Sequence, residues 1–431
     1  MILRKRLKAI FAFFAAACFL CVCLSCAAIL QAGAAETDYA ETGIDLLTSP
    51  PTAETVYKAG AGTVTYKPAA DGAAQIVLQD AELYAGTKVT YSPGNSTYTA
   101  LAAQGDVELV LQGESTIYLA PSGINKGLLF YDSNLTVKGE GSVWVGYKEE
   151  TSRNRNAYPM DVLEKSGAET DESGNFTLES GTLTLNAVGS TKRGCLTVNH
   201  KIEIRGGELK TNGQMAGVYS TYGDIEITGG KCTIENFNEY GLFARQGDVT
   251  IGGDAQVSVS STARDSGIGI CGGNIETEDG NVYIRGGKIS VDVLYLGIFT
   301  QRMENGGNIE ISGGELDINV PSTSKLGVGI YTQGEGGSIA VSGGTVNVSA
   351  SVTRNTEGEQ AVGIYSDGAV TVTGGSVRAG ASCGIGEAVG ISCQGEFTID
   401  GGEAVFFGDS RALDKAPVVS DTLTVSAASD V

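Results

Sequence analysis

An aromatic residue recurs five times in this 431-residue sequence, each time directly after a glycine and an aliphatic residue. The five are Tyr219, Phe243, Phe299, Tyr331 and Tyr365. Because side chains alternate between the two faces of a strand, only one of each aliphatic and aromatic pair can point inward. With the aliphatics inward, the aromatics would form an exposed ladder of flat apolar faces, on which sugar rings could stack. These five are therefore the candidate carbohydrate-binding residues; alternatively, they are aromatics that suit strands and pack on their neighbours.

Acidic residues could bind a metal or act in hydrolysis, but their positions favour other roles. Aspartates at turns could offer oxygen ligands to calcium, although Asp at a turn more often bonds to nearby amides. Outward glutamates recur at equivalent points of a repeat, so no pair is nominated for acid and base catalysis. The aspartates are Asp106, Asp224, Asp248 and Asp367, and the glutamates are Glu203, Glu226 and Glu310. We expect no catalytic residue and no defined metal site, and no required cofactor, with calcium as an optional ligand.

The histidine and the cysteines outside the N-terminal segment also suggest structural roles. The only histidine, His200, has no nucleophile partner in a recognisable arrangement and is expected at the surface. Two cysteines align with aliphatic positions of the repeat, Cys195 with Val218 and Cys232 with Leu209, and are expected to be buried. Cys383 and Cys393 lie ten residues apart around one corner, where a disulfide could form. The five cysteines outside the N-terminal segment include no Cys-x-x-Cys pair, so structural zinc has no support.

The aromatics belong to a phrase that is repeated eight times between Gly206 and Gly402. Each phrase holds an alternating apolar run, a Gly-Gly pair and a second alternating run, and successive pairs lie 23, 23, 34, 27, 30, 31 and 27 residues apart. Such a repeat is typical of a solenoid. Two glycine corners and a recurring Gly-Asp or Gly-Asn corner predict three short strands per coil. We therefore predict an all-β, right-handed parallel β-helix, and earlier phrases at Asp80, Gly113, Gly139 and Gly181 bring the total to about twelve coils.

One column of residues in the repeat should form the core of this solenoid. In each phrase a small or aliphatic residue follows the glycine pair by two to four positions, on the face that alternation turns inward. We expect these residues to stack on one another from coil to coil. They are Leu209, Cys232, Ala255, Ile289, Leu316, Val346, Val377 and Ala404.

The remaining segments flank or interrupt the solenoid. Residues 1–35 have basic residues, an apolar stretch and small residues before the first acid, as in a signal peptide, although the apolar stretch is long enough for a retained anchor. Residues 36–56 are expected to form a linker or N-terminal cap, 57–410 the β-helix domain and 411–431 a C-terminal cap or tail. The polar segment 146–175 breaks the period and is expected to be a long loop insertion.

The charge of the chain limits its partners. The formal net charge is −21 at pH 7, and loss of the four basic residues near the N-terminus would make it −25. A surface of this sign repels nucleic acid and anionic lipid at long range. We therefore expect no nucleic-acid binding and no membrane insertion after signal cleavage.

Some phrases resemble those of a known family. Residues Gly363–Gly368 followed by Val370–Gly375 are similar to the repeat of secreted bacterial carbohydrate-binding β-helix proteins, which share the fold of pectate lyases. This resemblance, over roughly residues 75 to 408, implies binding of plant cell-wall polysaccharides and bound calcium. The chain lacks the Asn-Thr-Asp and Gly-His-Gly motifs of polygalacturonases, and the Arg-x-Pro-x-x-Arg and Trp-Ile-Asp-His motifs of pectate lyases.

The sequence thus leads to a specific expectation and two alternatives. We expect an exported, monomeric, non-catalytic protein that binds a polysaccharide, from the plant cell wall or another source, and is secreted or held at the bacterial cell surface. One alternative is a surface adhesin or structural protein whose long wall contacts other proteins. The other is a polysaccharide lyase or glycoside hydrolase of the pectin-lyase-like fold.

Overall fold

A computed structural model describes the chain from Thr37 to Val425 with several gaps. The described residues are 37–38, 43–120, 123–148, 156–165, 173–187, 193–213, 215–264, 266–273, 280–301, 306–334, 336–354, 357–413, 418–419 and 424–425. The expected signal peptide over 1–35 lies outside them. Among the described residues, none forms a helix long and apolar enough to span a membrane.

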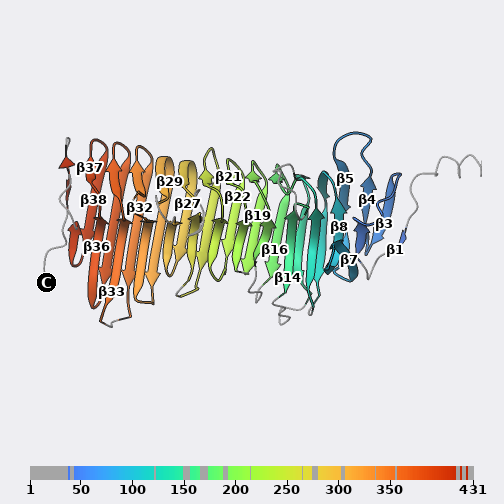
Figure 1. The fold of residues 1–431 in the computed structure, drawn as a ribbon, viewed down its shortest axis with the longest axis horizontal. Coiled ribbons are helices and arrows are strands. Elements are labelled where there is room, and N and C mark those ends of the chain that lie inside the picture. Colours follow the sequence, from blue (N-terminus) through green and yellow to red (C-terminus); the bar gives the residue numbers. More distant parts are fainter. Residues whose placement is uncertain are drawn as a thin grey trace, which may run out of the picture.

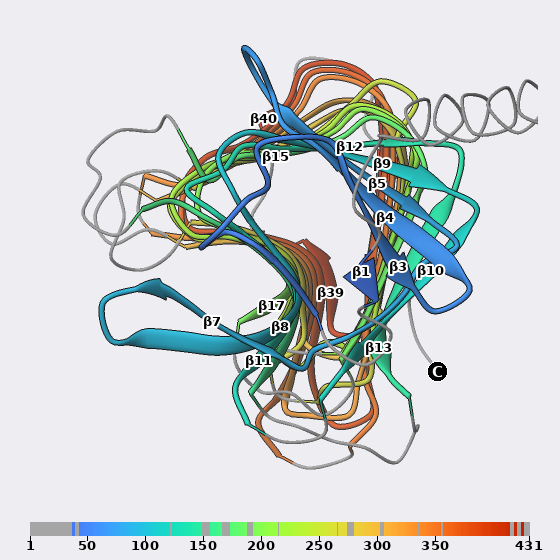
Figure 2. The same ribbon diagram turned by 90° about the vertical axis from the view of Figure 1, so that its right-hand side faces the viewer.

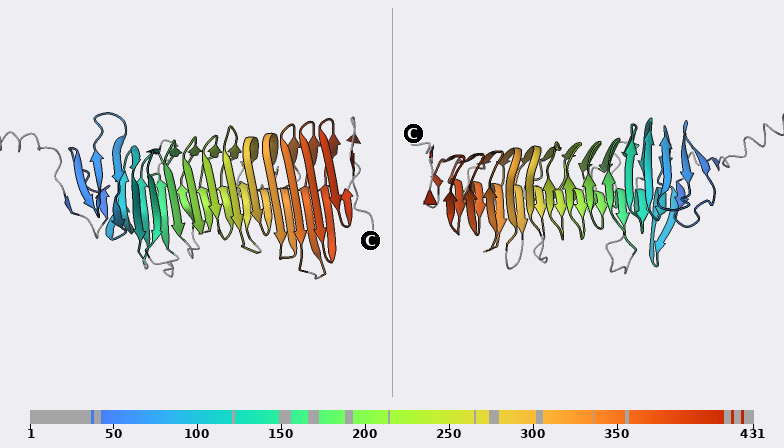
Figure 3. Two further views of the ribbon diagram at one scale, coloured as in Figure 1. Left: turned by 180° about the vertical axis from the view of Figure 1, so that it is seen from behind. Right: turned by 90° about the horizontal axis from the view of Figure 1, so that it is seen from above.

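The chain forms an all-β parallel solenoid of about ten turns, which confirms the predicted β-helix. Successive coils stack along one axis from the blue N-terminal end to the red C-terminal end (Figures 1 and 3). Each coil contributes strands to three walls around an elongated interior (Figure 2). The first and second walls belong to a 27-stranded sheet, which also includes β1, β3 and β4 at the N-terminal end, and the third wall belongs to a 14-stranded sheet.

The three walls consist of short strands, as the repeat predicts. The first wall contains β5 (Ala74–Gln79), β9 (Val107–Gln112), β12 (Leu135–Gly139), β15 (Phe176–Leu178), β18 (Ile202–Ile204), β21 (Ile225–Ile227), β24 (Val249–Ile251), β31 (Ser338–Val341), β34 (Ala369–Val372), β37 (Phe397–Ile399) and β40 (Val418–Val419). The second wall contains β6 (Glu82–Tyr84), β10 (Glu114–Leu119), β13 (Ser142–Tyr147), β16 (Thr182–Ala187), β19 (Glu208–Gly213), β22 (Lys231–Glu235), β25 (Gln256–Ser261), β32 (Thr345–Val352), β35 (Ser376–Cys383), β38 (Glu403–Gly408) and β41 (Thr424–Val425). Two longer strands, β27 (Val282–Val293) and β29 (Asn308–Ser322), run through both walls.

The third wall stacks one strand from each coil in parallel. It contains β2 (Ile44–Leu46), β8 (Asn95–Gln104), β11 (Asn125–Tyr131), β14 (Ala157–Leu163), β17 (Gly194–Val198), β20 (Ala216–Ser220), β23 (Tyr240–Ala244), β26 (Ile268–Gly272), β28 (Leu296–Gln301), β30 (Leu326–Gln333), β33 (Glu359–Ser366), β36 (Gly386–Cys393) and β39 (Arg411–Leu413). One further strand, β7 (Thr87–Ser92), pairs antiparallel with β8 and forms a hairpin that projects from the tube (Figure 2).

The interior is a continuous apolar core lined by all three walls. All eight residues of the predicted inner column are at most 2% exposed, which confirms their burial. The register corrects one member: Val257, not Ala255, stands between Cys232 and Ile289. Two additional residues after the Gly252-Gly253 pair displace Ala255 from the column, although it is still buried.

Side chains of Asp and Asn tie successive coils together at the corner between the third and first walls. Asp224 Oδ1 accepts a hydrogen bond from the backbone N–H of Asp248 at 2.8 Å, and Asp248 Oδ1 accepts one from that of Asn281 at 2.7 Å. Asn281 and Asn308 continue the series in the next two coils. These side chains satisfy backbone donors that a corner would otherwise leave unpaired. Asp224 and Asp248 therefore have the turn role that their sequence positions favoured.

The ends of the solenoid differ from the expected boundaries. Within 36–56, β1 (Thr37–Asp38) pairs with β3 (Thr55–Ala59), and β2 joins the third wall, so this segment is part of an N-terminal cap. In the cap, β4 (Gly62–Lys67) pairs antiparallel with both β3 and β5. The phrase at Asp80 lies between β5 and β6, which continue the first and second walls, and the solenoid has about ten turns where the sequence predicted about twelve coils. At the other end, β39, β40 and β41 continue all three walls within 411–431.

The expectation of a long loop over 146–175 was wrong for its central part. Residues Ala157–Leu163 form β14, which pairs in parallel with β11 and β17 in the third wall. The polar residues of this segment obscured a strand that includes Met160 and Val162, both fully buried. A coil thus passes through a segment that the sequence pattern assigned to a loop.

Candidate functional site

The outer face of the third wall carries two adjacent columns of apolar side chains. In the strands of this wall from β20 to β36, two outward residues flank a glycine and an inward aliphatic residue, as Val328 and Tyr331 flank Gly329 and Ile330. The register places the five predicted aromatics in one column, in the order Tyr219, Phe243, Cys271, Phe299, Tyr331 and Tyr365. We call the combined surface the aromatic strip: Tyr219, Tyr240, Phe243, Ile268, Cys271, Leu296, Phe299, Val328, Tyr331, Val362 and Tyr365.

The aromatics point outward as predicted, but they are not equally exposed. Phe243 and Phe299 are each 6% exposed, whereas Tyr219, Tyr331 and Tyr365 are partly exposed. The expectation of an exposed ladder therefore does not hold for the two phenylalanines, which are buried. The residues before the glycines, among them Tyr240, Leu296 and Val328, also point outward and pack in one cluster with the two phenylalanines.

Ring contacts link neighbouring coils along the strip. The centre of the Tyr331 ring lies 5.1 Å from the centre of the Phe299 ring and 5.1 Å from that of the Tyr365 ring. The ring centres of Tyr219 and Phe243 are 5.5 Å apart. Tyr240, which the sequence reasoning missed, stacks on Phe243 at 4.0 Å. In part of the strip the aromatic rings therefore pack on their neighbours in the next coil, as the alternative interpretation proposed. The tyrosines still present partly exposed rings along the axis.

A pocket of about 380 Å³ lies at the C-terminal end of the strip. Tyr331 and Tyr365 line it together with Val328, Val362 and Val389. Polar groups complete its lining: Gln360, Gln394, Ser392, and Glu387 paired with Arg411. Gln394 Nε2 donates a hydrogen bond to the Tyr365 hydroxyl at 3.4 Å. Flat rings beside amide and hydroxyl groups make this the part of the strip that is best suited to hold a polar ligand.

Burial in this pocket changes the pH at which the Tyr331 hydroxyl ionises. Burial, with a smaller contribution from Asp367, raises the pKa of Tyr331 to about 12 from an ordinary value of 10.0. The stability that the neutral phenol provides is therefore complete below pH 10 and is lost as the pH rises through about 12. Between pH 10 and about 12, we expect the free energy of unfolding to fall less in the Tyr331→Phe variant than in the parent protein. Urea unfolding across this range measures the difference, and equal pH dependence of the two proteins would contradict it.

At the N-terminal end the same outer face holds a buried ion pair. Lys126 Nζ lies 2.6 Å from Asp161 Oδ2, and the two side chains are 4% and 0% exposed. The β7 and β8 hairpin covers this region, and the Lys126 ammonium lies 4.8 Å from the centre of the Tyr91 ring. Asp161 occupies the column of the five aromatics, since it pairs in register with Thr197, which pairs with Tyr219. The sequence reasoning missed this pair because Asp161 fell in the expected loop.

The structure corrects the expectation for His200 and part of the expectations for the cysteines. His200 is 7% exposed and its Nε2 lies 2.8 Å from Glu164 Oε2, so the expected surface histidine is a buried one. Cys195 and Cys232 are buried as predicted, and burial raises the pKa of the Cys232 thiol to about 12. Cys195, however, lies beside Leu196, which is the residue in register with Val218. The suggested disulfide between Cys383 and Cys393 is not formed.

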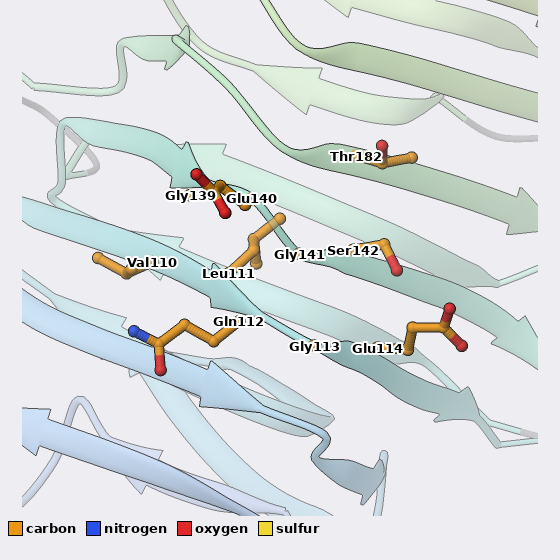
Figure 4. Close-up of a pocket in the computed structure, with 10 residues that line it drawn as sticks. All are labelled: Val110, Leu111, Gln112, Gly113, Glu114, Gly139, Glu140, Gly141, Ser142 and Thr182. Atoms are coloured by element: carbon orange, nitrogen blue, oxygen red, sulfur yellow. The ribbon is translucent and has the colours of Figure 1, made fainter.

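A larger hollow, of about 750 Å³, lies where the first wall turns into the second. Figure 4 shows its lining spread over successive coils, with Glu114 at the start of β10 and Glu140 in the corner between β12 and β13. Glycines at 113, 139 and 141 are among the residues that line it. Within the described parts of the chain, no group of three or more His, Cys, Asp or Glu could hold a metal ion. Of the two hollows, the C-terminal pocket of the strip has the more suitable lining for a ligand.

Fold and surface together define a parallel β-helix protein with an apolar strip along one outer wall. Comparisons with protein-family models, with curated proteins and with solved structures gave no match to this chain.

Proposed function

We propose that this chain is an exported protein that binds a neutral polysaccharide along the aromatic strip without cleaving it, at or near the bacterial cell surface. The single observation that carries the proposal is the pocket in which Tyr331 and Tyr365 stand beside Gln360 and Gln394. Tyrosine rings offer apolar faces to the C–H face of a sugar, and the amides can hydrogen-bond its hydroxyls.

The spacing of the rings suits a polymer. Neighbouring strands of a sheet lie about 4.8 Å apart, so each coil advances by that distance along the axis. One residue of an extended β-linked glycan advances by a similar length. A polysaccharide lying along the strip could therefore meet equivalent groups in successive coils, as Tyr331 and Tyr365 are.

The charges of the pocket favour a neutral ligand and binding without cleavage. The carboxylate of Glu387 pairs with Arg411, so the two charges offset each other. Hydrolysis of a glycosidic bond ordinarily uses two carboxyl groups placed on either side of it. Among the described residues that line the pocket, Glu387 is the one carboxylate.

Retention on insoluble neutral glycans tests the proposal. The double variant Tyr331→Ala, Tyr365→Ala should bind at least tenfold more weakly, because each buried ring contributes about 1 kcal/mol or more at a binding surface. Tyr283→Ala, which removes a partly exposed tyrosine from the first wall, is the matched control and should bind normally.

Circular dichroism and thermal melting should show that both variants remain folded. Unchanged retention of the folded double variant would contradict the proposal. Binding to other proteins but to no glycan would favour the adhesin alternative, and product release would favour the enzyme alternative. Each assay is run with calcium and again with a chelator, which also tests whether the cation takes part.

A further inference from the structure

A second group of aromatic residues lies on the outer face of the second wall, near the N-terminal end. Tyr84, Tyr118 and Trp144 come from the successive strands β6, β10 and β13 and are all partly exposed. The ring centroids of Tyr84 and Tyr118 are 4.9 Å apart, and those of Tyr118 and Trp144 are 6.1 Å apart. With Lys148 they form what we call the tryptophan platform.

The backbone is shaped to hold the indole ring. Gly146 follows two residues after Trp144 on the same strand, and a Cβ at Gly146 would lie 2.5 Å from Trp144 Cζ2. The missing side chain lets the ring pack against the strand. Gly146 is also in register with Tyr118, so a single glycine brings the tryptophan and a tyrosine ring together.

Charged groups border the rings and offset each other. Lys148 Nζ lies 5.2 and 5.4 Å from the ring centres of Tyr84 and Tyr118. It also donates a hydrogen bond to the Tyr84 hydroxyl at 3.0 Å, and that hydroxyl donates to Glu82 Oε1 at 2.5 Å. Hydrogen-bond donors and acceptors therefore surround an apolar surface on which one positive and one negative charge are balanced.

We infer that the tryptophan platform is a second binding site, which takes one to three residues of a neutral glycan. This inference rests on the proposed function. Rings bordered by polar groups match the apolar face and the equatorial hydroxyls of a sugar. A protein partner fits less well, because specific protein interfaces bury about 1,200–2,000 Å² and three partly exposed rings supply far less.

The location of the platform gives the site a distinct role. In Figure 2, β10 and β13 lie on the opposite side of the tube from β7 and β11 of the third wall. A polymer held on the aromatic strip and another held on the platform would therefore lie on different sides of one rigid body. The protein would bridge two glycan chains instead of holding one chain twice.

The experiment uses the intrinsic fluorescence of the protein, because Trp144 is the only tryptophan in the sequence. Cellohexaose and xylohexaose are the probes, titrated into the full chain. We expect a saturable change in tryptophan emission that persists in the Tyr331→Ala, Tyr365→Ala variant. Tyr118→Ala, which leaves the indole in place, should weaken this response at least tenfold, while Tyr283→Ala should leave it unchanged.

Calorimetry separates failure of this inference from failure of the proposed function. Two sites per chain in the parent, and one site in a folded Trp144→Ala variant, support the second site. Calorimetric binding without any change in tryptophan emission would overturn the platform and leave the aromatic strip standing. No binding of either probe, together with no retention on insoluble glycans, would overturn both.

Discussion

Asp161→Asn should destabilise the protein by about 3–5 kcal/mol, because it leaves the Lys126 ammonium buried without its counter-charge. The surroundings make this cost large. Leu129, Tyr131 and Leu163 lie in the apolar cluster at this end of the wall, and Val89 and Tyr91 close it from the hairpin. Within the described residues, Asp161 Oδ1 accepts no hydrogen bond, so the ion pair is the main compensation for burying the carboxylate. Urea unfolding followed by circular dichroism measures the loss.

A double substitution separates the broken pair from a simple loss of packing. Lys126→Met combined with Asp161→Leu removes both charges and keeps similar volumes, so its stability should equal or exceed that of the parent. If Asp161→Asn alone is as stable as the parent, water must reach the ion pair of Lys126 and Asp161. A double variant as unstable as Asp161→Asn would show that the pair fixes the position of the hairpin.

Gly329→Ala should destabilise the solenoid by about 1–3 kcal/mol or more, as overpacking of a core does. A Cβ at Gly329 would lie 2.0 Å from Val348 Cγ1 on the second wall and 2.6 Å from the carbonyl oxygen of Gly363 in the next coil. Val348 is buried and Gly363 O belongs to the backbone, so neither can move aside easily. The substitution should also shift Tyr331, two residues further along, and weaken glycan retention.

Gly252→Ala is the matched control for this effect. A Cβ there would approach only Arg285 Cβ, at 3.6 Å, which is an ordinary contact. Its urea midpoint should stay close to that of the parent. Equal destabilisation by the two substitutions would mean that loss of backbone freedom, and not the closeness of the walls at Gly329, sets the cost.

The repeat made most of the fold predictable. A Gly-Gly pair in each phrase marks the corner between the first and second walls, and the positive φ of Gly207, +71°, is of the kind that only glycine adopts readily. The pattern failed where a coil departs from the standard length. Ala255 was misaligned by two extra residues, and β14 was missed because Tyr158, Pro159 and Asp161 break the apolar alternation.

The sequence predicted which way the side chains of the candidate site point, but not how exposed they are. The alternation of side chains along a strand correctly predicted that Tyr331 points outward and Ile330 inward. It could not show that the residue before each glycine also turns outward, because the glycine interrupts the period of two. The tryptophan platform was missed for a related reason: its three rings come from the irregular early coils, where Trp144 is in register with Thr116 and not with Tyr118.

The Asp and Asn side chains at the corner between the third and first walls have a consequence for how such a protein can change in length. Each of them, from Asp224 to Asn308, is joined to the coil that follows by the same kind of bond in the same direction. Duplication or deletion of the gene segment that encodes one whole coil would recreate this hydrogen bond between the two coils that become neighbours. The tube could thus grow or shorten over evolutionary time in steps of one coil, and a longer variant would present a longer outer wall without any new kind of contact having to arise.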